Sequence, residues 1–286
     1  MSEQAQGDNH ADHANDVVRT QTFDAAGPVE LDVEVTAGTV EVRLTGDSGV
    51  TVEVRRTQAG TPPWADSAAG VLNWVGEMFG GQIGTFPSPA DTVGEARIEQ
   101  LGERIVVRGP KTAPPMASPL AVTVRAPEGS HVRARTKTAA VAVRGTAHRV
   151  DISTGSGSVT LDHVTDSATV RTSSGEVDVA TLAGPATVNA GSARVRLGTV
   201  SDAVLVRTTS SEITVGDAAA GSVEAISGTG DIRVGVRHDV TAEIDLSSGG
   251  GTVHSELDVA DVPPEESTEL TIRARSGAGR VTVARA

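Results

Sequence analysis

The chain has 286 residues and a formal net charge of −13, from 24 Lys and Arg against 37 Asp and Glu. This acidic balance disfavours binding to nucleic-acid phosphates or to anionic lipid, since both need a basic protein surface. The absence of cysteine excludes disulfides, iron–sulfur clusters and thiolate zinc sites, and aromatic residues make up only 2% of the chain.

The first twenty residues carry four acidic residues and one basic residue, Arg19, and contain no apolar run. They predict a disordered acidic tail over residues 1–20, followed by one domain over residues 21–286. This segment lacks the basic and apolar regions of a secretory signal peptide, and no stretch of the chain is long and apolar enough to cross a bilayer. We therefore expect a cytoplasmic protein with no membrane span.

An alternation typical of β-strands begins near residue 29. Leu31 and Val33 precede Val40 and Val42 by nine residues, and the same spacing separates residues 96–98 from 105–107 and residues 132–134 from 141–143. Apolar residues at i and i+2 indicate a strand with one buried face. The repeat therefore runs from about residue 29 to the C-terminus, with an interruption over residues 57–95.

The interruption predicts one short amphipathic α-helix near residues 63–80. Pro62-Pro63 suits the first turn of a helix, and Gly80-Gly81 suits its end. The helix would gather its apolar residues on one face: Trp64, Ala68, Val71, Leu72, Trp74, Val75, Met78 and Phe79. Two interpretations stay open, because this face could cap the β-structure or could dock on an unknown partner protein.

The strongest signal is a repeat of constant length. The first apolar residue after each Ser/Thr/Gly-rich corner falls at positions 141, 159, 177, 195 and 213, which are four consecutive steps of 18. The steps then lengthen, since the next such residues are Ile232, Val253 and Val281. Such a unit is too short for a propeller blade, and its strands are too close together for helical crossovers.

These observations predict an all-β, single-chain β-helix (solenoid) with coils of about 18 residues stacked about 4.8 Å apart, plus the short α-helix in the insertion. An antiparallel sandwich of short strands is the structural alternative, although a sandwich would not need so strict a step. The last strand, Val281-Thr-Val283, is followed by only three residues. We therefore expect the C-terminal end of the rod to be thinly capped, and end-to-end self-association to be possible.

The corner motifs carry a resemblance to a known family. The recurring Thr/Ser-Ser-Gly-x-Val-x-Val, as in Ser173-Ser-Gly-Glu-Val-Asp-Val179, with Ala-Thr-Val-x-x-Ser between copies, resembles the bacterial adhesin-like β-strand-repeat ("toastrack") family of uncharacterised function. The stretches 105–110, 119–124 and 126–130 are similar to actinobacterial members. The resemblance implies a non-catalytic β-helix, joined in some members to membrane-stress or lipid-signalling modules.

No catalytic, cofactor-binding or metal-binding constellation emerges from the sequence, so we predict none. The seven histidines do not share a column of the repeat, whereas a metal site needs several converging ligands. The chain has no glycine-rich phosphate loop and no nucleophile elbow. A carbohydrate-active β-helix enzyme with paired carboxylates remains the enzymatic alternative, although the coils lack aromatic platforms for sugars.

The outward-facing charges of the coils alternate in sign. One column reads Glu176, Arg194, Glu212, and the next places Asp178 beside Arg196. Opposite charges on adjacent strands stabilise a sheet modestly, so we expect Glu176 to pair with Arg194, Arg194 with Glu212, and Asp178 with Arg196.

The sequence therefore predicts a non-catalytic β-helical scaffold or protein-interaction module, which the resemblance would link to envelope-stress or signalling assemblies. A self-assembling structural protein, like the bactofilins that polymerise end to end, is the alternative.

Overall fold

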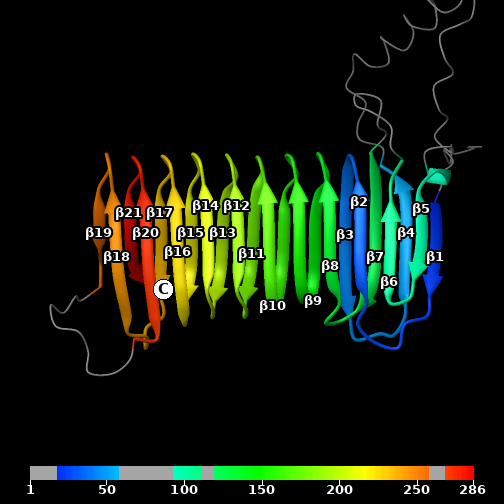
Figure 1. The fold of residues 1–286 in the computed structure, drawn as a ribbon, viewed down its shortest axis with the longest axis horizontal. Helices are drawn as coiled ribbons and strands as arrows, with labels where there is room; N and C mark the ends of the chain where they lie inside the picture. Colours follow the sequence, from blue (N-terminus) through cyan, green and yellow to red (C-terminus); the bar gives the residue numbers. More distant parts are fainter. Residues whose placement is uncertain (1–17, 58–92, 111–118, 258–267) are drawn as a thin grey trace, which may run out of the picture.

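A computed structural model describes residues 18–57, 93–110, 119–257 and 268–286. Over these ranges the regular structure is almost entirely β, with 21 strands that lie side by side along one rod (Figure 1). The all-β prediction is confirmed. The predicted helix near residues 63–80 lies outside the described residues.

The rod has two opposed faces, because each coil runs along one face, turns at a corner and returns along the other. The first face contains, in spatial order, the starts of β9 (Ala140–Thr154) and β10 (Val159–Thr172), then β11 (Glu176–Leu182), β13 (Arg194–Val200), β15 (Ile213–Ala218) and β17 (Ile232–Val236). The second face contains, in spatial order, β8 (His131–Thr136), the ends of β9 and β10, β12 (Ala186–Ala190), β14 (Val204–Thr208) and β16 (Gly221–Ser227). β9 and β10 bend from one face to the other, so both faces belong to one continuous sheet.

The constant 18-residue step of the sequence repeat decides which residues are neighbours on adjacent coils. Val159 is the neighbour of Val177 on the next strand, and Val177 is the neighbour of Val195, with all pairs parallel. These valines are fully buried, because alternate side chains point into the space between the two faces. The predicted β-helix, rather than the antiparallel sandwich, is therefore the architecture of the central coils.

Hydroxyl groups fix the corners at one edge of the rod. The buried Oγ1 of Thr154 accepts a hydrogen bond from the backbone N–H of Gly157 at 3.1 Å. Ser227 accepts one from Gly230 at 2.8 Å in the same way. Glycine is required at Gly157, since a Cβ there would collide with the backbone carbonyl of Ala139 in the adjacent coil.

The C-terminal end is not built in chain order. The last coil, β20 (Leu270–Ser276) and β21 (Val281–Arg285), inserts between β16/β17 and the preceding coil, β18 (Ala242–Ser248) and β19 (Val253–Ser255). Val281 therefore stacks on Ile232, and Val253 stacks on Val281. The expectation of a thinly capped C-terminal strand at the end of the rod is wrong, because β18 and β19 form that end (Figure 1).

The other end is interleaved in the same manner. The first coil of the chain, β2 (Glu30–Val35) and β3 (Gly38–Thr45), inserts between β8/β9 and a later coil, β6 (Arg104–Arg108) and β7 (Leu120–Pro127). β5 (Arg97–Leu101) pairs antiparallel with β6, so the nine-residue spacing from 96–98 to 105–107 is a hairpin and not a coil.

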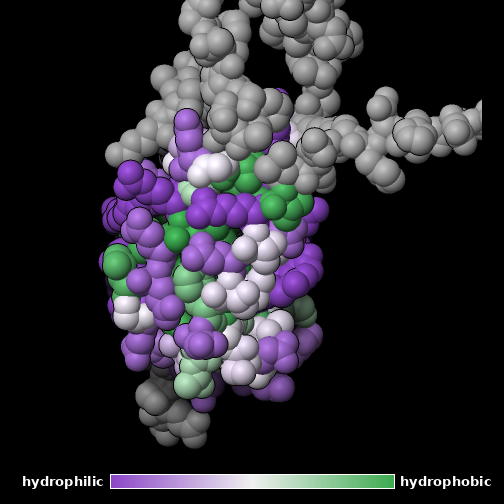
Figure 2. Space-filling view, turned by 90° about the vertical axis from the view of Figure 1, so that its right-hand side faces the viewer, coloured by the Kyte–Doolittle hydropathy of each residue, from purple (hydrophilic) through white to green (hydrophobic). Residues whose placement is uncertain are grey.

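Antiparallel strands close this end. β4 (Val50–Arg56) lies beside β7, and β1 (Val18–Phe23) lies beside β4. β1 begins inside the predicted 1–20 tail, because residues 18–20 form an antiparallel pair with β4. The composition of the tail alone cannot reveal a pairing partner so far along the chain. Figure 2 views the rod from this end, where hydrophilic and hydrophobic side chains intermingle. No helix among the described residues is long and apolar enough to cross a membrane.

Candidate functional site

The outer faces carry the charged columns that the sequence predicts. Arg194 pairs with Glu212 across consecutive coils, with 3.6 Å between Nε and Oε2, so this prediction is confirmed. Asp178 is in register with Arg196, yet the guanidinium of Arg196 forms its hydrogen bond with Glu176. The predicted pairs Glu176–Arg194 and Asp178–Arg196 are therefore replaced by one diagonal pair, because an arginine side chain is long enough to pass its nearest neighbour.

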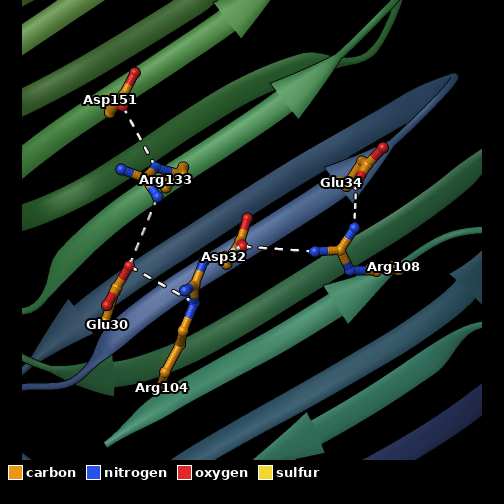
Figure 3. A network of polar contacts seen from close by, with 7 residues as sticks. All are labelled: Glu30, Asp32, Glu34, Arg104, Arg108, Arg133 and Asp151. Atoms are coloured by element: carbon orange, nitrogen blue, oxygen red, sulfur yellow. Dashed lines mark hydrogen bonds and ion pairs between the residues drawn. The ribbon is translucent and has the colours of Figure 1, made fainter. Parts of the chain in front are cut away.

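A network of polar contacts lies on the second face where β2 meets β6 and β8 (Figure 3). Its centre is Asp32, whose side chain is only 2% exposed although it points to the outer face. Arg104 donates a hydrogen bond to Asp32, and this bond raises the pKa of the Arg104 guanidinium above its usual value. Arg108 lies 3.9 Å from Asp32 and bonds Glu34 at 2.7 Å, so two arginines shield one buried carboxylate.

The network continues to the next coils through two more acids. Glu30 lies between Arg104 and Arg133, with N–O distances of 3.6 and 3.9 Å, and Arg133 reaches Asp151 at 3.4 Å. The network thereby joins β2 to β6 and to β8 and β9, which come much later in the chain. Its four carboxylates share three arginines, and each carboxylate has at least one arginine within 4.0 Å, so the arrangement suits the clamping of the interleaved first coil.

A hollow of about 520 Å³ adjoins this network, beside Glu30 and Arg104. His131 and His148 line it together with Leu101, which is 62% exposed. The Nε2 atom of His131 is buried without a hydrogen-bond partner among the described residues. Burial, reinforced by the charge of Arg149, lowers the pKa of His131, so its imidazole is neutral at pH 7.

The described residues contain no group of three or more His, Asp or Glu arranged to hold a metal ion. In this hollow, the neutral imidazole of His131 and the guanidinium of Arg104 can form hydrogen bonds with a bound molecule. The sequence reasoning missed this place, because His131 and Arg104 belong to coils that only the interleaved stacking brings together.

The comparison with protein families matches residues 121–286, more than half of the chain, to the model of the Toastrack DUF4097 family. The chain belongs to the Toastrack family. The sequence resemblance is confirmed at this level, and the likeness to actinobacterial members stays a prediction.

The solved structures similar to this Toastrack chain include the following three. A "putative adhesin" from Parabacteroides merdae has 7% identity and a TM-score of 0.45, covering 95% of this chain and 97% of its own. A "putative adhesin" from Bacteroides fragilis has 10% identity and a TM-score of 0.43, covering 93% and 97%. A "putative lipid binding protein" from Parabacteroides distasonis has 9% identity and a TM-score of 0.36, covering 95% and 98%. Comparison with curated proteins finds no match.

The site residues that the sequence proposed for the Toastrack chain all lie between Trp64 and Phe79. They fall in residues 58–92, outside the described residues. Both interpretations of this segment, a cap and a docking helix, therefore stay predictions.

Proposed function

We propose that this chain is a non-catalytic β-solenoid that serves as a scaffold or interaction module, presenting the side-chain rows of its outer faces to a partner. One observation carries the proposal. Among the described coils, many charged side chains pair with a charge of opposite sign on a neighbouring strand, as Arg194 does with Glu212 and Arg196 with Glu176, so that they form rows along the outer faces. Long rows of paired charge suit recognition over an extended surface, whereas glycoside hydrolysis needs two carboxylates facing one bond.

For the cellular role and location of the chain, we keep the expectations that came from the sequence. We propose a place in an envelope-stress or signalling assembly, as the family resemblance implies, and a cytoplasmic location, as we expect from the sequence.

A photo-crosslinking experiment tests the scaffold function. A photoreactive residue placed at exposed Ala180 on the first face, or at Thr209 beside the corner, should capture a defined partner in cells of the native host. The purified partner should then bind at a saturable ratio. The enzymatic alternative is examined by incubating the purified chain with acidic and neutral polysaccharides. Turnover that disappears when a coil carboxylate is replaced by its amide would overturn the proposal.

A second candidate function is end-to-end self-assembly, and the β18/β19 end favours it. Among the described residues, β18 pairs only with β20 and β19 only with β21, so each leaves one backbone edge without a strand. Val253 is 46% exposed there, and Leu246 is only partly buried against the core. Unpaired strand edges with apolar side chains favour association with another chain.

Sedimentation velocity over a range of concentrations separates the two functions. Self-assembly predicts a mass that grows with concentration, and Val253→Lys should return the chain to a monomer because it places a charge on the joining edge. A monomer at every concentration would remove this candidate and leave the scaffold function in place.

For the segment near residues 63–80 we propose the capping role, because solenoid ends need protection from water. Trp64 and Trp74, the two tryptophans of the chain, report on it. Blue-shifted emission that resists quenchers in the purified chain supports a cap, whereas solvent-exposed emission that shifts only when a partner is added supports docking.

A further inference from the structure

A line of arginine side chains runs along the outer surface of the second face, next to the Ser/Thr/Gly corner. Strand register places one residue from each of five successive coils in this line, which we name the arginine row: Arg135, Ser153, Arg171, Asn189 and Arg207. Its three arginines are exposed, and none of them forms an ion pair with a described residue.

The arginine row differs from the rest of the column to which it belongs. Beyond its two ends, Arg108 pairs with Glu34 at 2.7 Å and Arg275 pairs with Asp245 at 3.0 Å. Within the row, the outward residues on the same strands beside Arg171, Asn189 and Arg207 are Thr169, Thr187 and Leu205, which carry no charge. Three acids do lie close to the row in register: Glu34 beside Arg135, Asp151 near Arg171, and Glu224 near Arg207. Glu34 and Asp151 pair with other arginines, and no acid among the described residues forms an ion pair with the row, so three arginines stay without an ion-pair partner in a chain of net charge −13.

The strip is hollowed. A depression of about 520 Å³ is lined by Arg171, Asn189 and Arg207, with the hydroxyl groups of Ser153, Ser173 and Thr209 around them. No side chain of Arg171, Asn189 or Arg207 makes a hydrogen bond to another described residue. Guanidinium forks and an amide without partners form a surface that can bind carboxylates and backbone amides of another molecule.

The spacing of the row selects the conformation of that molecule. Coils are about 4.8 Å apart, so arginines on alternate coils recur about every 9.6 Å. A polyproline II segment has three residues per turn and rises about 3.1 Å per residue, which places side chains i and i+3 on one side about 9.3 Å apart. An extended β-strand repeats each face after about 6.6 Å and does not match. Polyproline II also leaves its backbone amides free for the hydroxyl and amide groups of the depression.

We propose that the arginine row binds an acidic segment of a partner protein, held in the polyproline II conformation with Asp or Glu at every third residue. The row has no aromatic side chain on which nucleic-acid bases could stack, which disfavours single-stranded nucleic acid. This inference rests on the proposed interaction function and names the class of partner and its binding surface.

The test uses the full chain and two synthetic peptides of equal composition. One is five repeats of Glu-Pro-Pro, which places a carboxylate at every third residue, and the other groups its five glutamates before ten prolines. Titration at low ionic strength should show tighter binding of the repeated peptide, weakened by added salt. Arg171→Gln with Arg207→Gln should weaken binding about tenfold per arginine. The matched control, Arg125→Gln with Arg233→Gln, removes two exposed arginines from the first face and should change binding less than about twofold.

A second variant separates lost binding from lost folding. Asn189 lies in register between Arg171 and Arg207, so Asn189→Asp gives both arginines an acidic neighbour. This variant should keep or raise the melting temperature and should abolish peptide binding.

Several results would overturn the inference: equal effects of the two double variants, equal binding of the two peptides, or tighter binding of hyaluronan or of oligo-thymidine than of the repeated peptide. A crosslinked partner whose binding does not need the arginine row would leave the proposed function standing and remove this inference.

Discussion

Replacement of Val177 by aspartate tests the stacked core at its centre. Val177 is fully buried on β11, and its neighbours in register, Val159 and Val195, are also fully buried. An introduced carboxyl group at this position would be enclosed by aliphatic side chains of three coils. The stacked valines on either side offer it no hydrogen-bond donor. A solenoid cannot avoid this cost by moving one strand, since each coil shares its hydrogen bonds with two others.

The magnitude follows from two terms. Loss of the buried valine side chain costs about 1.5–3 kcal/mol. At pH 7 the carboxyl group must stay neutral in the folded state, which requires its pKa to rise by about 3 units and costs about 4 kcal/mol. The total of about 6 kcal/mol is comparable with the whole stability of many domains, about 5–15 kcal/mol. Val177→Asp should therefore leave little folded protein at pH 7.

Thermal unfolding followed by circular dichroism measures the effect. The matched control is Ala180→Asp, which adds the same charge at an exposed position of the same strand and should change stability by less than about 0.5 kcal/mol. Because the penalty comes from a raised pKa in the folded state, it should shrink as the pH falls toward about 4, leaving only the valine term. Equal melting temperatures for the two variants, or a deficit that does not change with pH, would refute the reasoning.

Three further predictions concern the ladder, the buried histidine and a corner. In a double-mutant cycle, Glu176→Gln and Arg196→Gln should show a coupling of about 0.2–1 kcal/mol, and zero coupling would mean that the diagonal pair contributes nothing. The lowered pKa of His131 means that the unfolded state takes up its proton first, so stability should fall as the pH drops below about 6.5, and His131→Gln should remove that component. Its titration by NMR should show a midpoint below that of a free histidine, and an ordinary midpoint would contradict the burial argument. Gly157→Ala should destabilise the chain by several kcal/mol because its Cβ meets a backbone carbonyl, whereas Gly27→Ala, which has open space, should have little effect; similar melting points for the two would show that the corner can move.

The sequence by itself determined the central coils. The alternation of apolar residues at i and i+2 decides which side chains point inward, and a constant repeat length leaves adjacent coils one way to align their buried rows. Val159, Val177 and Val195 are therefore stacked as the spacing predicts. The Ser/Thr/Gly corners were readable for the same reason, since a hydroxyl bond to the backbone two or three residues away is a local interaction.

The ends and the surface contacts were decided only by the tertiary structure. The alternation of apolar residues shows that one face of a strand is buried, but it does not show which coil covers that face. Nothing in the sequence therefore indicates that Val281, and not the earlier Val253, stacks on Ile232. The same holds for Arg196, whose long side chain bonds Glu176 and not its register neighbour Asp178. It also holds for Asp32, whose arginine partners belong to a coil much later in the chain. The arginine row also depended on the fold, because it appears only when register assigns a position in each coil to one outward line. Local pattern fixes the inward or outward direction of a side chain, but the identity of its neighbour across the stack depends on how whole coils compete for the same buried face.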